Sequence, residues 1–309
     1  MATAIVNRPA LGNFPPGDYA ALLHSSVLAV APPGMTQVFT ALAGSDANET
    51  AYKAAFMAFR RRQRGPAARD FTADELASCM RNQPPGSPDL AIASFTGGFH
   101  GRLFGSLSTT RSKPIHKLDI PAFAHWPQVP FPALQYPLAA HAAENAAEEQ
   151  RCLDATEQLL ATWPTPIAAL VVEPIQSEGG DNHASPAFFR HLRALTKRLG
   201  VLLIVDEVQT GVGSTGCFWA HEHWQLPLDS PPDLVTFSKK AQTAGYYFAD
   251  PGLRPSHPYR QFNTWMGDPS KALLFRAIVA EIRRLDLVAH TVRLPHPLPF
   301  TILARGLTG

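Results

Sequence analysis

The sequence predicts an α/β protein built on a parallel central sheet flanked by helices. Two observations predict this class. Short apolar runs alternate with stretches of helical periodicity, and the runs Ile167–Val172 and Val201–Val205 contain no polar residue. Unbroken apolar runs are typical of strands buried on both faces, as in βαβ units. The 309 residues, 45% hydrophobic and 17% charged, suffice for one large globular domain or two modest ones.

The first half of the chain contains one predicted strand between helical segments. The helix-like stretch Thr50–Phe59 comes before the strand Leu90–Phe95, which runs into a glycine-rich turn. The proline- and aromatic-rich stretch Ser112–Pro137 has no helical period and is too long for a simple connector. We interpret it as a functional loop or a partner contact. Ala139–Trp163 returns to a helical pattern with a solvated acidic face.

The second half alternates strand and helix more regularly. Ser185 is placed to cap a helix that begins at Pro186 and stops at Gly200, because proline suits the first helical turn and glycine the position after the last. The apolar run Leu234–Phe237 predicts a further buried strand, and Lys271–Leu287 predicts a helix.

We divide the chain into one large domain, residues 1–290, and a divergent tail, residues 291–309. Thr291–Phe300 contains three prolines, which cannot continue the preceding helix. We therefore expect the tail to have no assigned place in the domain.

The composition excludes several classes of protein. A net charge of +2 argues against a nucleic-acid binder, and the basic run Arg60–Arg64 suits a solvated helix end better than a phosphate patch. Cys79, Cys152 and Cys217 are far apart, which excludes a disulfide scaffold or a zinc knuckle. With no apolar run that could span a membrane and no recognisable leader, we expect a cytosolic protein. The mitochondrial matrix is the alternative if a presequence is missing.

Polar residues at strand ends and at one helix start are candidates for a ligand site. Gly44 and Ser45 lead into a helix and predict an anion site, although an ordinary helix cap explains them more simply. Asp206 would keep a heterocyclic nitrogen protonated, or else it is a cap or a surface ion pair. Lys239 would form a Schiff base in a partly desolvated pocket, although adjacent lysines such as Lys239 and Lys240 are usually solvated.

Two other motifs do not support a site. Gly211–Gly216 matches the dinucleotide fingerprint, but Asp206–Thr210 separates it from the preceding strand and no suitable helix pattern follows. His221 and His223 are two residues apart, so they would not share a helical face, and no further ligand spacing indicates a metal. We therefore predict neither a nicotinamide or flavin site nor a metal site.

Taken together, these segments resemble the fold-type-I, class-III aminotransferases, and within them the group that acts on 4-aminobutyrate. The likeness extends from about Asn7 to Leu287, and several of its strings are specific to this one group. The matching segments are Ser94–Arg102, Ser112–Pro121, Val172–His183, Asp206–Gly211, Phe218–Trp224, Thr236–Lys240 and Phe262–Ser270.

The resemblance implies the large domain of a homodimeric enzyme that uses pyridoxal 5'-phosphate, with a mostly parallel sheet flanked by helices. Lys239 would carry the cofactor as a Schiff base, with Lys240 as the fallback, and Asp206 would pair with the pyridine nitrogen. Further cofactor contacts that the resemblance implies are Gly44 and Ser45 at the phosphate, Phe99 and His100 against the ring, Gln209 at the ring oxygen, and Thr264 of the partner subunit at the phosphate.

For the substrate, the resemblance places Arg102 at the carboxylate, with Glu173 nearby and Glu178 neutralising a second arginine. The implied reaction moves the amino group of 4-aminobutyrate to 2-oxoglutarate, giving succinate semialdehyde and glutamate. A transaminase for another ω-amino acid is an alternative; the group-specific strings disfavour ornithine, whereas β-alanine is harder to exclude.

The chain also departs from the family pattern. Ala43 and Asp46 stand where animal members carry cysteines that hold an iron–sulfur cluster, so we predict no cluster. Thr243-Ala244-Gly245 replaces the Thr-Gly-Gly of the family. Against the family pattern, the large domain is incomplete at its amino end, before Ile5. The carboxy-terminal small domain, with its second arginine, is missing after about His290. A further alternative is therefore an inactive fragment that only binds cofactor or partner subunits.

Overall fold

The computed structural model describes residues 15–65 and 70–293. The tail predicted for residues 291–309 lies outside the described residues, except for residues 291–293. None of the helices in these two ranges is long and apolar enough to span a membrane.

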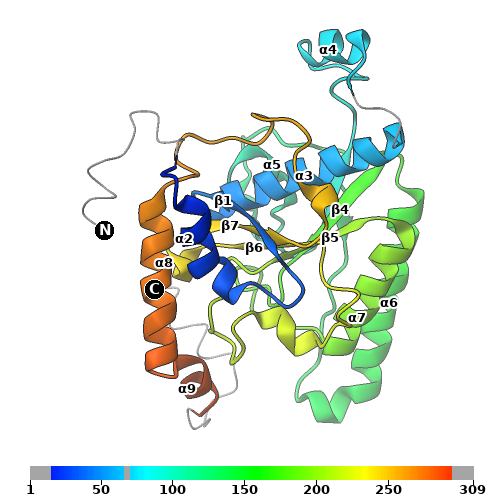
Figure 1. Ribbon diagram of the computed structural model, residues 1–309. Helices are drawn as coiled ribbons and strands as arrows, with labels where there is room; N and C mark the ends of the chain where they lie inside the picture. Colours follow the sequence, from blue (N-terminus) through cyan, green and yellow to red (C-terminus); the bar gives the residue numbers. More distant parts are fainter. Residues whose placement is uncertain (1–14, 66–69, 294–309) are drawn as a thin grey trace.

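A seven-stranded sheet forms the centre of the described chain, in the order β1-β7-β6-β5-β4-β2-β3 (Figure 1). The strand β7 runs antiparallel to both of its neighbours, β1 and β6, and the remaining pairings are parallel. The expected mostly parallel sheet is thus confirmed. The strands are β1 (Gln37–Ala41), β2 (Ala91–Phe95), β3 (Gln128–Val129), β4 (Ile167–Val172), β5 (Leu202–Asp206), β6 (Leu234–Phe237) and β7 (Ala244–Phe248).

The four strands that the sequence predicts are present as β2, β4, β5 and β6, and each is buried along its whole length. The strands that it does not single out have physical reasons for a weak signal. In β1 the first three residues are only partly buried, so no apolar run marks the strand. The strand β3 has two residues, and β7 begins with the weak strand formers Ala244 and Gly245.

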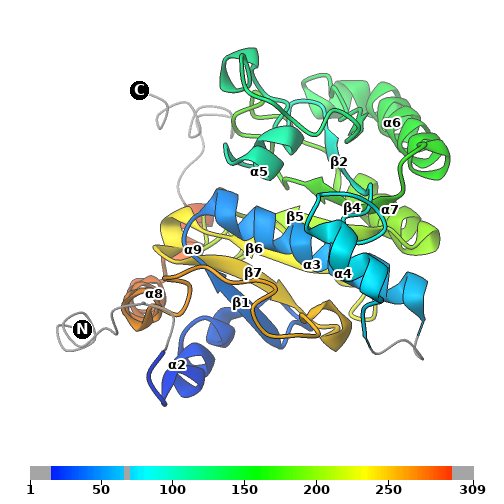
Figure 2. The ribbon, with the colours of Figure 1, turned by 90° about the horizontal axis from the view of Figure 1, so that it is seen from above.

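Helices cover both faces of the sheet, with α3 on one face and α7 on the other (Figures 1 and 2). The α-helices are α2 (Tyr19–Ser25), α3 (Gly44–Arg64), α4 (Ala73–Cys79), α5 (Phe104–Thr109), α6 (Ala142–Thr162), α7 (Pro186–Leu199), α8 (Pro269–Arg284) and α9 (Leu287–Arg293). Short 3-10 helices are η1 (Leu28–Val30), η2 (Pro114–His116), η3 (Leu138–His141), η4 (Ala220–Trp224), η5 (Lys239–Ala241) and η6 (Pro251–Leu253).

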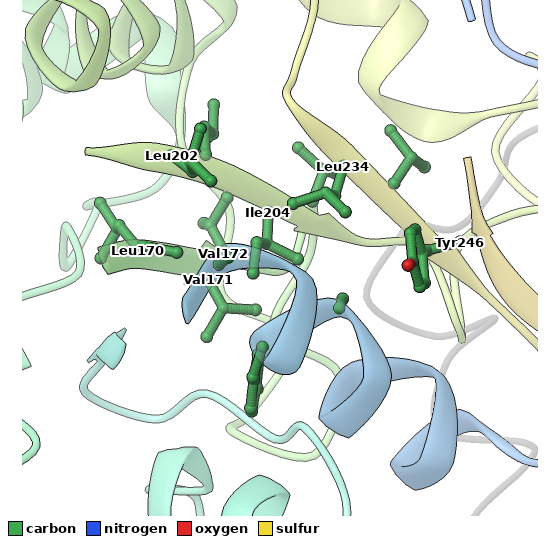
Figure 3. Packing of buried hydrophobic residues seen from close by; sticks show 14 of the residues in the cluster. Leu170, Val171, Val172, Leu202, Ile204, Leu234 and Tyr246 are labelled. Carbon is green, nitrogen blue, oxygen red and sulfur yellow. The ribbon is translucent and has the colours of Figure 1, made fainter. Parts of the chain in front are cut away.

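The helix α3 packs closely against the sheet because its inner face is lined with small residues. Ala51, Ala55 and Ala58 follow one another at helical spacing and are all buried. Val171 of β4 and Ile204 of β5 lie close to this helix in the core (Figure 3). The segment predicted as a helix, residues 50–59, is therefore the middle of a helix of 21 residues whose amino end reaches the edge of the sheet.

The predicted ends of α7 are confirmed, whereas the helix predicted for residues 271–287 ends earlier, at Arg284. Ser185 Oγ accepts a hydrogen bond from the backbone N–H of Phe188, and Gly200 adopts the left-handed conformation that ends the helix. A separate short helix, α9, begins at Leu287 and ends at Arg293. The periodicity therefore places the end of α8 three residues too late and does not single out α9.

The stretch predicted as a long loop, residues 112–137, contains η2 and the short strand β3 but is otherwise irregular. Trp126 anchors it, since its indole Nε1 donates a hydrogen bond to the carbonyl of Leu90 at 3.0 Å. Ile115 and Leu118 remain exposed on its surface. Its role as a functional loop or a partner contact stays a prediction.

The pairing of β1 with β7 depends on a glycine. Gly245 has φ +156°, and a Cβ there would clash with the backbone oxygen of Phe39 in β1. We expect Gly245→Ala to lower the free energy of unfolding by about 3 kcal/mol, measured by urea denaturation. Gly17→Ala is the matched control, because no atom lies within 4 Å of the added Cβ. Equal losses in the two variants would contradict this account.

Candidate functional site

Four strands of the sheet direct polar residues into one cavity of about 200 Å³ at their carboxyl ends. Asp206 is the last residue of β5, Glu173 directly follows β4, and Lys239 lies just after β6. The amino end of α3 closes the cavity from the other side. The described residues that line it are Gly44, Ser45, Asn48, Phe99, His100, Gly101, Arg102, Glu173, Asp206, Val208, Gln209 and Lys239.

The amino end of α3 is free to bind an anion. The N-cap residue, Ala43, has no side chain that could accept a hydrogen bond from the first turn. Ser45 Oγ instead accepts a bond from the backbone N–H of Arg102 at 3.2 Å, so an ordinary side-chain cap does not explain this residue. A Cβ on Gly44 would lie 2.6 Å from Val208 Cγ1, so glycine is required for this close approach. The helix dipole and exposed N–H groups therefore favour a bound anion at this point.

Asp206 is held rigidly beneath the cavity and is only 4% exposed. Its Oδ2 accepts a hydrogen bond from Asn48 Nδ2 at 2.8 Å and lies 2.9 Å from His100 Nδ1. Its Oδ1 accepts a bond from the backbone N–H of Val208 at 3.0 Å. These contacts fix the carboxylate without an arginine or lysine partner, so its negative charge remains available to a ligand.

Asn48 is a site residue that the sequence analysis missed. It lies on α3 one helical turn beyond Gly44 and is 1% exposed. Besides Asp206, it binds the carbonyl of His100 through Nδ2 and the hydroxyl of Thr236 through Oδ1. A buried asparagine in a helix interior must satisfy its amide, but its burial is visible only in the structure, so no signal in the sequence identifies it.

His100 lines the cavity, and its place against a cofactor ring stays a prediction. Its side chain has no exposed surface, and Nδ1 lies 2.9 Å from Asp206 Oδ2. Phe99 also lines the cavity but is only partly buried. We assign His100 to holding Asp206, and Phe99 is the aromatic side chain that a planar ligand would meet.

Lys239, and not Lys240, directs its amine toward the site. Lys239 Nζ donates a hydrogen bond to Gln209 Oε1, and both residues line the cavity. Lys240 Nζ lies 3.4 Å from Ser214 Oγ, outside the cavity. Lys239 has φ +46°, a backbone strain that is common at functional sites. Its side chain is exposed, which differs from the partly desolvated lysine that the sequence predicts.

Glu173 is a buried carboxyl at the floor of the site. Its Oε1 accepts a hydrogen bond from the backbone N–H of Phe99 at 2.8 Å. Burial, together with the negative charge of Asp206, raises the pKa of Glu173 well above its usual range. Glu173 therefore retains its proton to a higher pH than an exposed glutamate does.

Of the three residues predicted to lie near the substrate, Arg102 and Glu173 line the cavity and Glu178 does not. Arg102 lines the cavity, with its guanidinium carbon 4.9 Å from the centre of the Phe99 ring and Nη2 3.3 Å from His116 Nε2. Glu178 is not part of the cavity lining and pairs with Lys113 at 3.0 Å. The hydrogen bond from Lys113 lowers the pKa of Glu178.

Thr264 is exposed and does not line the cavity of its own chain. Its neighbour Asn263 donates a hydrogen bond through Nδ2 to Asp46 Oδ1, which places this segment next to the first turn of α3. The contribution of this threonine to a second subunit stays a prediction.

The two motifs set aside in the sequence have structural roles. Residues 211–216 form turns, and no α-helix follows them, as a dinucleotide site would require. His221 Nδ1 lies 2.7 Å from Glu207 Oε1, and His223 Nε2 lies 2.9 Å from the carbonyl of Thr215. Within residues 15–65 and 70–293, no three His, Cys, Asp or Glu side chains gather as metal ligands would.

Comparison with known proteins gives a consistent result. The family model for class-III aminotransferases matches residues 1–300. The chain is 70% identical to a 4-aminobutyrate aminotransferase of Emericella nidulans, over 94% of this chain and 58% of that protein. It is 52% identical to the 4-aminobutyrate aminotransferase, mitochondrial, of Sus scrofa, over 93% of this chain and 57% of that protein. The chain thus spans less than two thirds of either relative.

The fold also matches solved structures. A lysine aminotransferase from M. tuberculosis, described in its internal aldimine form, superposes with a TM-score of 0.74 at 30% identity. The match covers 93% of this chain and 62% of that chain.

The raised pKa of Glu173 predicts a dependence of stability on pH. Between its ordinary pKa of roughly 4.3 and its raised value, the folded protein binds more protons than the unfolded chain. The free energy of unfolding should therefore fall as pH rises through this window. Glu173→Gln should remove this fall. The free energy of unfolding of the variant, relative to wild type, should therefore grow by about 1.4 kcal/mol for each pH unit across the window. Urea unfolding measured across pH checks this prediction.

The matched control is Glu178→Gln, because the pKa of Glu178 is lowered. That carboxylate contributes stability that is lost as pH falls, so its removal should have the opposite pH dependence. Stability curves for Glu173→Gln that run parallel to those of wild type would show that Glu173 does not retain its proton.

Proposed function

The chain belongs to the class-III aminotransferase family, and on that premise we propose that it is the cofactor-binding domain of an enzyme that transfers the amino group of 4-aminobutyrate to 2-oxoglutarate. The products would be succinate semialdehyde and glutamate. The observation that carries this proposal is the meeting of three groups in one cavity. These are the uncapped amino end of α3, the buried carboxylate of Asp206 and the amine of Lys239.

The residues present fit pyridoxal 5'-phosphate. The first turn of α3, at Gly44 and Ser45, offers N–H groups to a phosphate. Asp206 offers a fixed negative charge to a protonated ring nitrogen, and Phe99 offers an aromatic face to the ring. When bound, the cofactor would supply an aldehyde that takes up the substrate amine and a ring that accepts the electrons of the broken C–H bond.

The residues of this chain would hold the cofactor and the substrate and would move the proton. The carboxylate of Asp206, held by Asn48 and His100, would keep a proton at the ring nitrogen. Lys239 Nζ would remove the proton from the amine-bearing carbon of the substrate, and Gln209, which contacts it, would bind the ring oxygen. Arg102 would hold the substrate carboxylate through its planar guanidinium.

Two acidic residues would set the charge around the bound substrate. Glu173, whose pKa is raised, would place a neutral carboxyl beside the substrate. Glu178 would remain ionised, because Lys113 stabilises its charge, and could neutralise an arginine from outside the described residues. β-Alanine stays the competing substrate, since it differs from 4-aminobutyrate by one methylene group.

We further propose a homodimer, in which Thr264 of the partner subunit reaches the phosphate. The predicted absence of an iron–sulfur cluster rests on Ala43 and Asp46 and remains a prediction. The cytosolic location expected from the sequence is likewise a prediction. The relative from Sus scrofa is named as mitochondrial, so the two compartments are alternatives for fractionation to decide.

The decisive test is the visible absorption spectrum of the purified chain after addition of pyridoxal phosphate and removal of the excess. We expect a band above 400 nm, of the order typical for conjugated imines, and a pyridoxyl group on Lys239 after borohydride reduction and peptide mapping. Lys239→Ala should lose the band and Lys240→Ala should keep it, because only Lys239 faces the cavity.

Activity with 4-aminobutyrate and 2-oxoglutarate, with β-alanine as the competing donor, then separates the hypotheses. A retained band without activity would identify an inactive fragment that binds cofactor. A folded chain without a band would contradict the proposed function. A pyridoxyl group on Lys240 would show that the assignment is shifted by one residue.

A further inference from the structure

A second cavity lies at the opposite end of α3 from the candidate site. Its volume is about 160 Å³, and four arginines line it: Arg61 and Arg64 from the last turns of α3, and Arg254 and Arg260 from the loop after β7. Gly44 and Arg61 are about 25 Å apart along the helix, at a rise of 1.5 Å per residue. The cavity is therefore separate from the site proposed for catalysis.

The helix dipole explains only half of this cluster. Arginines in the last turn of a helix are favoured by the partial negative charge there, which accounts for Arg61 and Arg64. Arg254 and Arg260 belong to a different segment, and no such effect brings them to the same cavity. Because Arg254 and Arg260 join Arg61 and Arg64 in one cavity, the basic run is more than the solvated helix end that the sequence favours.

Nearby acids neutralise only part of the charge of the cluster. Glu75 pairs with Arg64 at 2.7 Å and with Arg60 at 3.2 Å, and its other oxygen accepts a bond from the backbone of Thr72. Among residues 15–65 and 70–293, Arg61 and Arg260 form no ion pair.

The two remaining charged residues of the lining, Arg254 and Asp70, leave a positive excess. Within the described part of the chain, the only hydrogen bond from the Arg254 side chain goes to the neutral amide of Gln37. Asp70 is the one carboxylate in the described lining. Because arginine stays protonated in proteins, the cavity carries a net positive charge.

The guanidinium groups are supported by an aromatic ring. The guanidinium carbons of Arg64 and Arg260 lie 4.9 and 5.0 Å from the centre of the Phe71 ring. The ring of His257 packs on Phe71 at 5.3 Å. Stacking on an aromatic face holds each guanidinium in place. Glu75 occupies Nε and Nη2 of Arg64, whereas the Arg260 side chain donates no hydrogen bond to the described residues, so Arg260 keeps its N–H edge for an acceptor. Burial, and then the charge of Arg64, lower the pKa of Arg260, so the like charges are crowded and an anion would relieve them.

We propose that this arginine pocket binds a small, doubly charged oxyanion of the phosphate type. Its volume of about 160 Å³ lies below the roughly 300–1,000 Å³ of typical small-molecule pockets, which suits a small tetrahedral anion. Arginine forks that converge from two segments match the several oxygens of such an anion. Inorganic phosphate and the phosphate group of a small metabolite share this chemistry.

The test is isothermal titration of the purified chain with inorganic phosphate, at a constant ionic strength set with chloride. Arg61→Gln combined with Arg260→Gln should raise the dissociation constant by at least about tenfold, because bonds to charged groups are lost. The matched control combines Arg62→Gln with Arg276→Gln. It removes the same charge from arginines that do not line the cavity.

The amino end of α3 also attracts anions, so Gly44→Ala serves as a second arm. Its added Cβ would meet Val208 and disturb that end alone. Phosphate binding should survive in Gly44→Ala. Three outcomes would each overturn the proposal. They are loss of binding in Gly44→Ala, equal binding by the arginine variant and wild type, and the absence of saturable binding.

Unchanged far-ultraviolet circular dichroism verifies that every variant is folded. Glucose 1-phosphate, titrated in parallel, distinguishes free phosphate from a phosphate monoester as the preferred ligand.

Discussion

The buried hydrogen bonds of Asn48 join the parts on which the candidate site depends. One amide links α3 to Asp206 of β5 and to Thr236 of β6, and it also binds the backbone of the loop after β2. The helix end that would hold a phosphate and the carboxylate that would hold a ring are therefore fixed relative to each other. Because a buried amide without partners costs about 1–3 kcal/mol for each group, this arrangement tolerates little change.

The site combines stabilising and costly features. Asp206 and Glu173 are both buried carboxyl groups, and the sheet provides no cation to pair with them in the hydrogen bonds described. The left-handed backbone of Lys239 adds strain at the same place. The apolar strands beneath, and the alanine face of α3, supply the burial that offsets these costs. The core thus stabilises the fold, whereas the residues of the site destabilise it, as expected where a rigid scaffold supports a reactive site.

The sequence predicts the buried half of this molecule better than its edges. Runs such as Ile167–Val172 identify central strands, because burial on both faces requires continuous apolar side chains. Strand β1 has no such pattern, since it lies at the edge of the sheet and is partly exposed. The same limit applies to the site. Polar residues that follow strands, such as Asp206, are visible in the sequence, whereas Asn48 acts through contacts with distant segments that no local pattern encodes.

The position of β7 determines when the sheet can be completed. Among the described strands, β1 pairs only with β7, so the backbone of Ala41 has no partner in the sheet until Ala244 has been synthesised. At ribosomal rates of about 5–20 residues per second, this delay is on the order of 10–40 seconds. A nascent chain would therefore carry an unpaired edge strand and the apolar face of α3 for that time. Such contacts between distant segments fold late, and this makes the early translation product a natural substrate for chaperones.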